Sequence, residues 1–150
     1  MRNYYFKYKS DVFRFALSIV KDPYLAEDIL QETFLKLCEN YDNIRDRSKI
    51  KYWLFTTARN QAITYLNKDN NLTVIDDISF KKQSSEEEVG FLELISFLPI
   101  EEQQLVSLRI IGKFKWKEIA KILNLSEESA RKRYQRILNK IKNQLKEKTQ

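Results

Sequence analysis

Four side chains near the C-terminal end have the chemistry and spacing of a nucleic-acid contact. Arg131, Lys132, Gln135 and Arg136 recur at helical intervals, so they share one face if the segment forms an α-helix. Guanidinium and ammonium groups bind phosphates, and arginine and glutamine side chains also hydrogen-bond base edges. We therefore expect this face to enter a groove of duplex DNA.

Two consecutive helices are expected to position these side chains. Residues 116–123 carry apolar side chains at helical spacing, and Asn124 can adopt the left-handed conformation that ends a helix. Ser126 is suited to cap the next helix, which has an apolar stripe made of Ala130, Tyr134, Ile137, Leu138, Ile141 and Leu145. The pattern predicts a helix-turn-helix whose second helix Ser126 and Ser129 position. Taken alone, it also fits a solvated basic helix on a small helical domain.

Composition excludes most catalytic and metal chemistry. The 150 residues include no histidine and only two glycines, which removes most metal sites, histidine-based catalysis and glycine-rich phosphate loops. The single cysteine, Cys38, cannot form an internal disulfide, and we expect it to be buried on an apolar helix face. We expect no enzyme activity, no catalytic residue, no cofactor and no metal.

Charge is unevenly distributed along the chain. Residues 1–68 carry a net charge of +4, residues 69–104 carry −7 and residues 105–150 carry +9. A concentrated positive charge attracts an anionic partner, because lysine and arginine displace the counterions condensed on nucleic acid. The sequence has no apolar run long enough to span a bilayer and no signal-peptide pattern at its start. We expect a cytoplasmic protein without membrane insertion.

The N-terminal part is expected to form three helices. The first runs from Tyr4 to Val20 with Phe6 among its core residues, and Asp22 and Pro23 begin the second. A polar loop between Glu39 and Lys49 precedes a third helix capped near Ser48, whose apolar stripe includes Trp53 as a core residue.

A polar segment separates these helices from the C-terminal part. Residues 69–87 are rich in charged and amide side chains and predict a flexible acidic linker, part of which could dock through scattered apolar residues. Four helices follow, at residues 88–98, 99–111, 115–123 and 126–148. We therefore expect an all-α fold of two small helical domains, residues 1–68 and 88–150, the second containing the helix-turn-helix.

Two motifs in the N-terminal part carry a family resemblance. They are Tyr24-Leu25-Ala26-Glu27-Asp28-Ile29-Leu30-Gln31-Glu32-Thr33-Phe34-Leu35-Lys36-Leu37 and, later, Trp53-Leu54-Phe55-Thr56-Thr57-Ala58-Arg59-Asn60. Together with the C-terminal helix-turn-helix, these motifs resemble those of the extracytoplasmic function (ECF) sigma factors, a group in the sigma-70 family of bacterial RNA polymerase sigma factors. The resemblance covers nearly the whole chain. The sequence departs from the family pattern at Thr64, where aspartate is common, and at Asn67, where arginine is common.

The resemblance implies a polymerase-binding face on the first motif. In the family this helix docks on the coiled coil of the polymerase clamp, and the matching positions are Asp28, Gln31, Glu32 and Lys36, with Phe34 on the packed side. Acidic and amide groups on one exposed stripe suit a basic helical partner. A plain solvated acidic face is the alternative interpretation.

The resemblance also implies two promoter contacts. The loop before the third helix and that helix's exposed face would bind the downstream element, where a base is extruded from the single-stranded non-template strand. The matching candidates are Asn43, Arg45, Arg47, Ser48, Lys51, Tyr52, Arg59 and Asn60. The upstream element would be bound by Ser126, Ser129, Arg131, Lys132, Gln135 and Arg136.

These expectations define a function and its rivals. The chain is expected to bind core RNA polymerase, recognise promoter DNA and assist strand opening, with an anti-sigma protein as a further partner that the resemblance allows. One alternative is a free-standing helix-turn-helix transcription regulator. Another is a sigma-like decoy that occupies polymerase without reading DNA.

Overall fold

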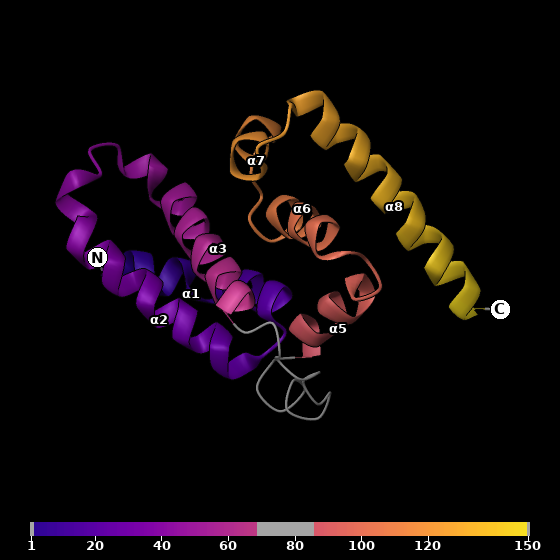
Figure 1. The fold of residues 1–150 in the computed structure, drawn as a ribbon, viewed down its shortest axis with the longest axis horizontal. Helices are drawn as coiled ribbons and strands as arrows, with labels where there is room; N and C mark the ends of the chain where they lie inside the picture. The colour runs from indigo at the N-terminus through magenta and orange to yellow at the C-terminus, as the bar shows by residue number, and fades with distance from the viewer. Residues whose placement is uncertain (1, 69–85, 150) are drawn as a thin grey trace. The chain divides into compact units, whose positions relative to one another are not determined.

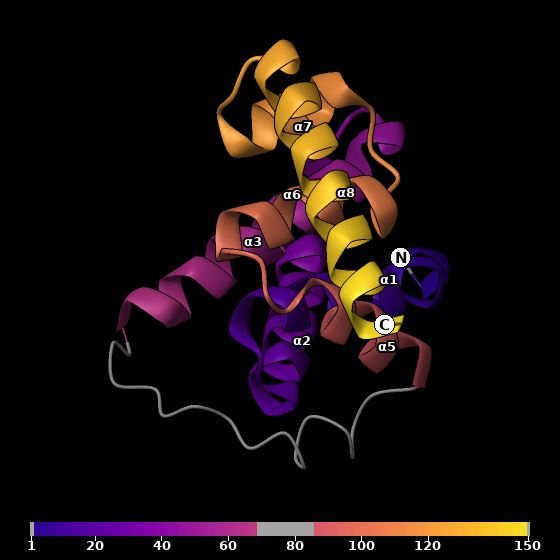
Figure 2. The same ribbon diagram turned by 90° about the vertical axis from the view of Figure 1, so that its right-hand side faces the viewer.

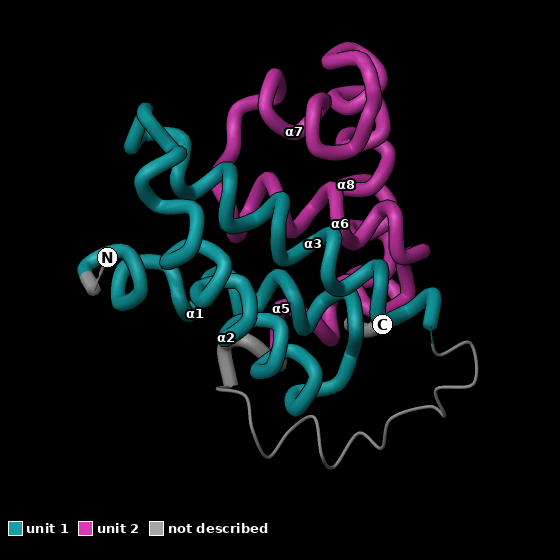
Figure 3. Tube along the Cα trace, turned by 60° about the vertical axis from the view of Figure 1, so that its left-hand side comes forward, with its two compact units in different colours: residues 1–89 teal, residues 90–150 magenta. Residues whose placement is uncertain are grey.

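The computed structural model describes residues 2–68 and 86–149, and all regular elements in these two ranges are helices. The chain divides into two compact units, Met1–Val89 and Gly90–Gln150 (Figure 1); Figure 3 draws them in teal and magenta. The expected all-α class is therefore confirmed. Residues 69–85, which make up most of the expected linker, lie outside the described residues.

Three long helices build the first unit, and each packs against the other two. Two short 3₁₀ turns connect the second helix to the third. The elements are α1 (Arg2–Val20), α2 (Pro23–Asn40), η1 (Tyr41–Asn43), η2 (Arg47–Lys49) and α3 (Ile50–Lys68).

The core of this unit contains side chains from all three helices. Phe15 of α1 and Phe55 of α3 are both fully buried, with ring centroids 5.2 Å apart. Ile29 and Leu37 of α2 are also fully buried. Burying each such side chain contributes about 1.5–3 kcal/mol, so the three helices depend on one another for stability.

Local signals set the boundary between α1 and α2 as the sequence predicts. Lys21 has a φ of 62°, and its amide donates to the Leu17 carbonyl (2.9 Å), which ends α1. Asp22 accepts a hydrogen bond from the Tyr24 amide through Oδ1 (2.9 Å), and Pro23 occupies the first helical position. The predicted capping role of Asp22 is confirmed.

Three sequence expectations for this unit are wrong in detail. Phe6 is 57% exposed, because its neighbour Tyr5 takes the position against Phe34, with ring centroids 5.0 Å apart. Cys38 is exposed, since it follows the fully buried Leu37 and the helical rotation of about 100° per residue turns it outward. Trp53 is only half-buried.

The second unit contains α6 (Ile100–Ile110), α7 (Trp116–Leu123) and α8 (Glu127–Thr149), together with the part of α5 (Glu86–Ile95) that begins at Gly90. Helices α6, α7 and α8 pack pairwise, and Figures 1 and 2 show the long yellow α8 alongside α6. The apolar core lies between them and includes Leu105, Leu108, Phe114, Ile119 and Ile137.

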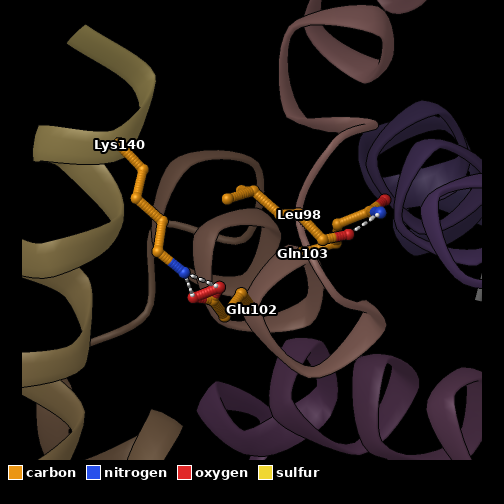
Figure 4. A network of polar contacts seen from close by, with 4 residues as sticks. All are labelled: Leu98, Glu102, Gln103 and Lys140. Carbon is orange, nitrogen blue, oxygen red and sulfur yellow. Dashed lines mark hydrogen bonds and ion pairs between the residues drawn. The ribbon is translucent and has the colours of Figure 1, made fainter. Parts of the chain in front are cut away.

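Two polar contacts tie the elements of this unit together (Figure 4). The buried Gln103 donates from Nε2 to the Leu98 carbonyl (2.7 Å), which fixes the turn before α6. Lys140 of α8 donates to both carboxylate oxygens of Glu102 on α6, at 2.6 and 2.9 Å. Because Lys140 is half exposed, this pair contributes modestly to stability and mainly fixes the register of α8 on α6.

In this unit the end of α7 lies where the sequence predicts it, but one residue that the sequence predicts to be in the core is exposed. Asn124 has a φ of 56° and ends α7, as predicted. Leu145, expected in the apolar stripe of α8, is 45% exposed. Helix α8 has 23 residues, whereas α6 has 11 and α7 has 8, so the shorter helices cannot cover its C-terminal turns.

The turn between α6 and α7 requires glycine. A Cβ at Gly112 would lie 2.6 Å from two ring atoms of Phe114 and 2.8 Å from the Leu108 carbonyl oxygen. Phe114 is almost completely buried, and its amide donates to that same carbonyl (3.3 Å), so neither neighbour can move freely. Only a residue without a side chain fits here.

We therefore expect Gly112→Ala to destabilise the second unit by about 1–3 kcal/mol, as overpacking of a core does. The chain's other glycine provides the control. A Cβ at Gly90 in α5 would meet nothing within 4 Å, so Gly90→Ala should stabilise the unit by about 0.5–1 kcal/mol. Urea unfolding followed by Trp116 fluorescence in a Trp53→Phe background measures both variants. Equal stability of the two would contradict the steric argument.

Candidate nucleic-acid interface and docking face

Three cationic candidates and Gln135 share an exposed face of α8. Arg131, Lys132, Gln135 and Arg136 are all exposed, whereas Ala130 is fully buried. Ile137 and Ile141 also belong to the buried side, which faces α6 and α7. The four candidates therefore contribute nothing to the apolar core and are available to a ligand.

The start of α8 is fixed by its cap. The Ser129 amide donates to Ser126 Oγ (3.0 Å), and the Ala130 amide donates to the Ser126 carbonyl (3.0 Å). Glu127 and Glu128 follow in the first turn, where acidic side chains favour the positive end of the helix dipole. The predicted cap is confirmed, and it fixes the backbone direction from which the cationic side chains project.

One candidate is paired with an acidic neighbour. Lys132 Nζ lies 3.0 Å from Glu128 Oε1, one turn earlier, and both side chains are more than two-thirds exposed. Exposed pairs at this spacing contribute at most a few tenths of a kcal/mol. A phosphate can therefore replace the carboxylate at little cost.

One contact between α7 and α8 was not visible in the sequence. The Arg109 guanidinium lies 4.5 Å from the centroid of the Trp116 ring, and its Nη1 donates to the Phe114 carbonyl (2.8 Å). The Trp116 ring also contacts Tyr134 of α8, with centroids 5.1 Å apart. This stack orients α8 against the preceding helix. Its residues come from three helices, so helical spacing alone could not predict it.

The four docking candidates on α2 are of two kinds. Asp28 and Gln31 are exposed, and Gln31 donates from Nε2 to Glu27 Oε1 (3.2 Å). Glu32 and Lys36 are half-buried. The outer face of α2 is therefore acidic and amide-rich, and the second pair lies closer to α3.

A buried glutamine connects that second pair to α3, and helical spacing in the sequence gives no sign of this contact. When the Gln61 amide is oriented to satisfy its neighbours, its nitrogen donates to Glu32 Oε2 and its oxygen accepts from Lys36 Nζ, both at 3.2 Å. Gln61 is 7% exposed. This bridge holds the side chains of Glu32 and Lys36 in place before any partner binds.

Asp46 shapes the loop between α2 and α3. Its Oδ1 accepts from the Ser48 hydroxyl (2.6 Å) and the Ser48 amide (3.0 Å), and these bonds lower the pKa of the Asp46 carboxyl. The Ser48 hydroxyl thus already donates its proton within the loop. The capping residue in the structure is Asp46, two residues before the position near Ser48 that the sequence predicts, and the 3₁₀ turn that it caps runs directly into α3 at Ile50. Asn43 and Arg45 are exposed on this loop.

Arg47 is held against Tyr41 rather than extended into solvent. Its Nη1 donates to the Tyr41 carbonyl (2.8 Å), and its Cζ lies 3.6 Å from the centroid of the Tyr41 ring. Tyr4 of α1 contacts the same ring, with centroids 6.3 Å apart. The sequence offered no signal for this stack, because the three residues come from different elements.

The remaining candidates lie along α3. Lys51, Tyr52 and Arg59 are half-buried, and Asn60 is exposed. Burial lowers the pKa of the Arg59 guanidinium, which nevertheless stays charged at neutral pH. Arg59 lies about 12 Å along the helix from Lys51, given a rise of about 1.5 Å per residue. The candidates thus cover an extended surface and do not form a single pocket.

Other kinds of site are not evident in the described part of the chain. Among residues 2–68 and 86–149, no group of three or more metal-binding side chains lies together. None of the helices in these ranges is long and apolar enough to cross a membrane.

Comparison with known proteins assigns both units to one family. The family model for Sigma-70 region 2 matches residues 5–71, and the model for Sigma-70, region 4 matches residues 89–141. The ECF RNA polymerase sigma factor SigM of Bacillus subtilis (strain 168) is 38% identical over 133 residues, covering 82% of this chain and 81% of SigM. The RNA polymerase sigma factor SigV of the same strain is 29% identical over 143 residues, covering 92% and 86%.

A solved structure has a similar fold. It is the sigma factor RpoE in complex with the anti-sigma factor NepR, from Bartonella quintana, and it matches with a TM-score of 0.74. The match covers 97% of this chain and 96% of that chain at 21% sequence identity.

Proposed function

The chain belongs to the sigma-70 family of RNA polymerase sigma factors, in its ECF group, and from this membership we propose how its two units divide the work. It is an RNA polymerase sigma factor, with core polymerase and promoter DNA as partners. Members of the family are non-catalytic regulators. We propose accordingly that polymerase supplies all the chemistry, and that this chain supplies binding energy and promoter specificity in the cytoplasm.

The proposed domains follow the sequence expectation. Residues 1–68 bind core polymerase and the downstream promoter element, residues 69–87 link the domains, and residues 88–150 bind the upstream element. The observation that carries this assignment is the opposite character of two exposed helix faces. The outer face of α2 presents Asp28 and Gln31, whereas the outer face of α8 presents Arg131 and Arg136. An acidic face suits a basic protein partner, and a cationic face suits DNA.

The proposed polymerase contact is made by Asp28, Gln31, Glu32 and Lys36, with the clamp coiled coil as the partner. The Gln61 bridge supports this assignment, because side chains held in place lose less conformational entropy on binding. The loop after α2 and the exposed face of α3 bind the downstream element. Asn43 and Arg45 are the candidates for hydrogen bonds to the extruded base.

An anti-sigma protein is a further proposed partner. A protein of similar fold was crystallised in complex with an anti-sigma factor, and this likeness supports the proposal. Such a partner would control when the chain reaches polymerase.

Reconstituted transcription tests the proposed function. We expect core polymerase from the same cell, supplied with this chain and genomic DNA, to start transcripts at discrete sites that core polymerase alone does not use. Sequencing the 5′ ends of the transcripts locates these promoters. A free-standing regulator would bind DNA alone and leave core polymerase inactive, and a decoy would bind polymerase without producing specific starts. Either result would contradict the proposal.

A further inference from the structure

A planar cation lies on an aromatic ring at the surface of the first unit. The Arg47 Cζ is 3.6 Å from the Tyr41 ring centroid, which is the distance of direct van der Waals contact. Arg47 is nevertheless exposed, whereas Tyr41 is half-buried. The guanidinium therefore packs on the ring while the Arg47 side chain remains accessible to a ligand.

Two contacts hold this stack in place. The hydrogen bond from Arg47 Nη1 to the Tyr41 carbonyl (2.8 Å) ties the guanidinium to the backbone of the residue on which it stacks. The Tyr4 ring of α1 contacts the Tyr41 ring at a centroid distance of 6.3 Å. The Arg47 side chain is therefore ordered before a ligand binds, and it loses less conformational entropy on binding than a free arginine would.

The stack adjoins the surface proposed for single-stranded DNA. Asn43 and Arg45 are exposed on the same loop, and Asp46 fixes the turn that follows by accepting two hydrogen bonds from Ser48. An unpaired base needs a flat surface to replace the stacking it loses, and guanidinium planes provide one. The ordered guanidinium of Arg47 provides such a flat surface, and Asn43 and Arg45 on the same loop can hydrogen-bond the edge of a base.

We propose that Arg47 stacks on an unpaired base of the non-template strand, with Tyr41 as the residue that positions it. This inference rests on the proposed function, because it assigns a role within the downstream-element surface. It distinguishes Arg47 from an ordinary phosphate contact. A phosphate contact depends on charge, which lysine also supplies, whereas stacking depends on the planar guanidinium, which lysine lacks.

The test measures binding of a single-stranded probe to the holoenzyme. The probe is a fluorescein-labelled oligonucleotide with the non-template sequence of a promoter mapped in the reconstituted reaction. Fluorescence anisotropy over a range of salt concentrations gives the affinity and its salt dependence. We expect Arg47→Lys to weaken binding about tenfold while the salt dependence stays unchanged.

Substitutions at the supporting ring test the positioning role. Tyr41→Leu should weaken binding of the probe about as much as Arg47→Lys does. Tyr41→Phe, which keeps the ring, should bind the probe as the wild type does. Retention of core polymerase by each variant shows that the unit is folded.

Three outcomes overturn the inference, and they are distinguishable. If Arg47→Lys binds as the wild type does, while Arg47→Gln weakens binding and lowers the magnitude of the salt slope by about 0.7, Arg47 is a phosphate contact. If Tyr41→Leu binds as the wild type does, the ring plays no part. If the wild-type chain directs no specific start sites, the proposed function itself fails, and the stacking role fails with it.

Discussion

Reversing Arg131 and Arg136 to glutamate is expected to abolish upstream-element binding and leave the affinity for core polymerase intact. Both side chains are exposed on α8, on the side away from the buried Ala130 and Ile137. A good contact to a base edge contributes about 1–3 kcal/mol, and each reversal also adds repulsion toward the phosphates. We therefore expect a loss of about a hundredfold or more.

The measurement uses a duplex containing the upstream element of a mapped promoter. Anisotropy titration gives the affinity, and co-elution with core polymerase gives the retained partner binding. Lys142→Glu with Lys146→Glu provides the matched control, because it makes the same change in net charge further along the same helix. If the control loses as much DNA affinity as Arg131→Glu with Arg136→Glu, net charge and not the proposed face explains the effect. Equal loss of polymerase binding would contradict the assignment of the domains.

Signals that act within a few residues could be predicted from the sequence. The end of α7 at Asn124 and the cap of α8 at Ser126 depend on one residue's backbone conformation or one side-chain hydrogen bond. The Asp22 cap of α2 is of the same kind. Such features require no knowledge of the neighbouring helices, so the order and type of the elements followed from the residues alone.

Features that depend on where a neighbouring helix ends could not be predicted. Helical spacing places Leu145 on the apolar stripe of α8, yet α6 and α7 are too short to cover it. Phe6 and Tyr5 are both aromatic, and the position of Phe34 decides which of them packs inward, where Tyr5 is half-buried and Phe6 stays exposed. Spacing identifies a face of a helix but does not say how much of that face finds a partner.

Polar side chains show the same limit at the candidate site. The sequence marks Glu32 and Lys36 as exposed docking residues, but in the structure they are half-buried and bridged through Gln61 of α3. It likewise marks Arg47 as one cation among several and gives no sign of its stack on Tyr41. Which residues are candidates was predictable, whereas the contacts that orient each side chain depend on the packing of separate elements.

The second large effect is expected at the docking face. Asp28→Lys with Glu32→Lys should lower the affinity for core polymerase by about a hundredfold or more and leave upstream-element binding by the chain intact. Disrupting a buried charge pair at an interface costs about 2–5 kcal/mol, and a reversed charge adds repulsion toward a basic partner. The affinity is measured by titrating core polymerase over the chain immobilised on a sensor surface.

The double reversal needs a companion variant that leaves Glu32 unchanged, because substituting Glu32 also removes a contact inside the first unit. Glu32→Lys would break the bridge through Gln61 and place a second ammonium group near Lys36, so part of its effect could come from lost stability. Asp28 is exposed, and Asp28→Lys alone therefore reports the docking face without disturbing α3. Urea unfolding of both variants separates the two contributions.

The charge control for this experiment lies in the second unit. Glu101→Lys with Glu147→Lys changes the net charge by the same amount at two exposed positions outside the docking face. It should leave the polymerase affinity unchanged. If Asp28→Lys and the double reversal both bound polymerase as the wild type does, α2 would not be the docking helix, and an acidic face selected only for solubility would be the simpler explanation. Because the two proposed interfaces have opposite charge and lie in separate units, no single change in net charge can mimic both sets of results.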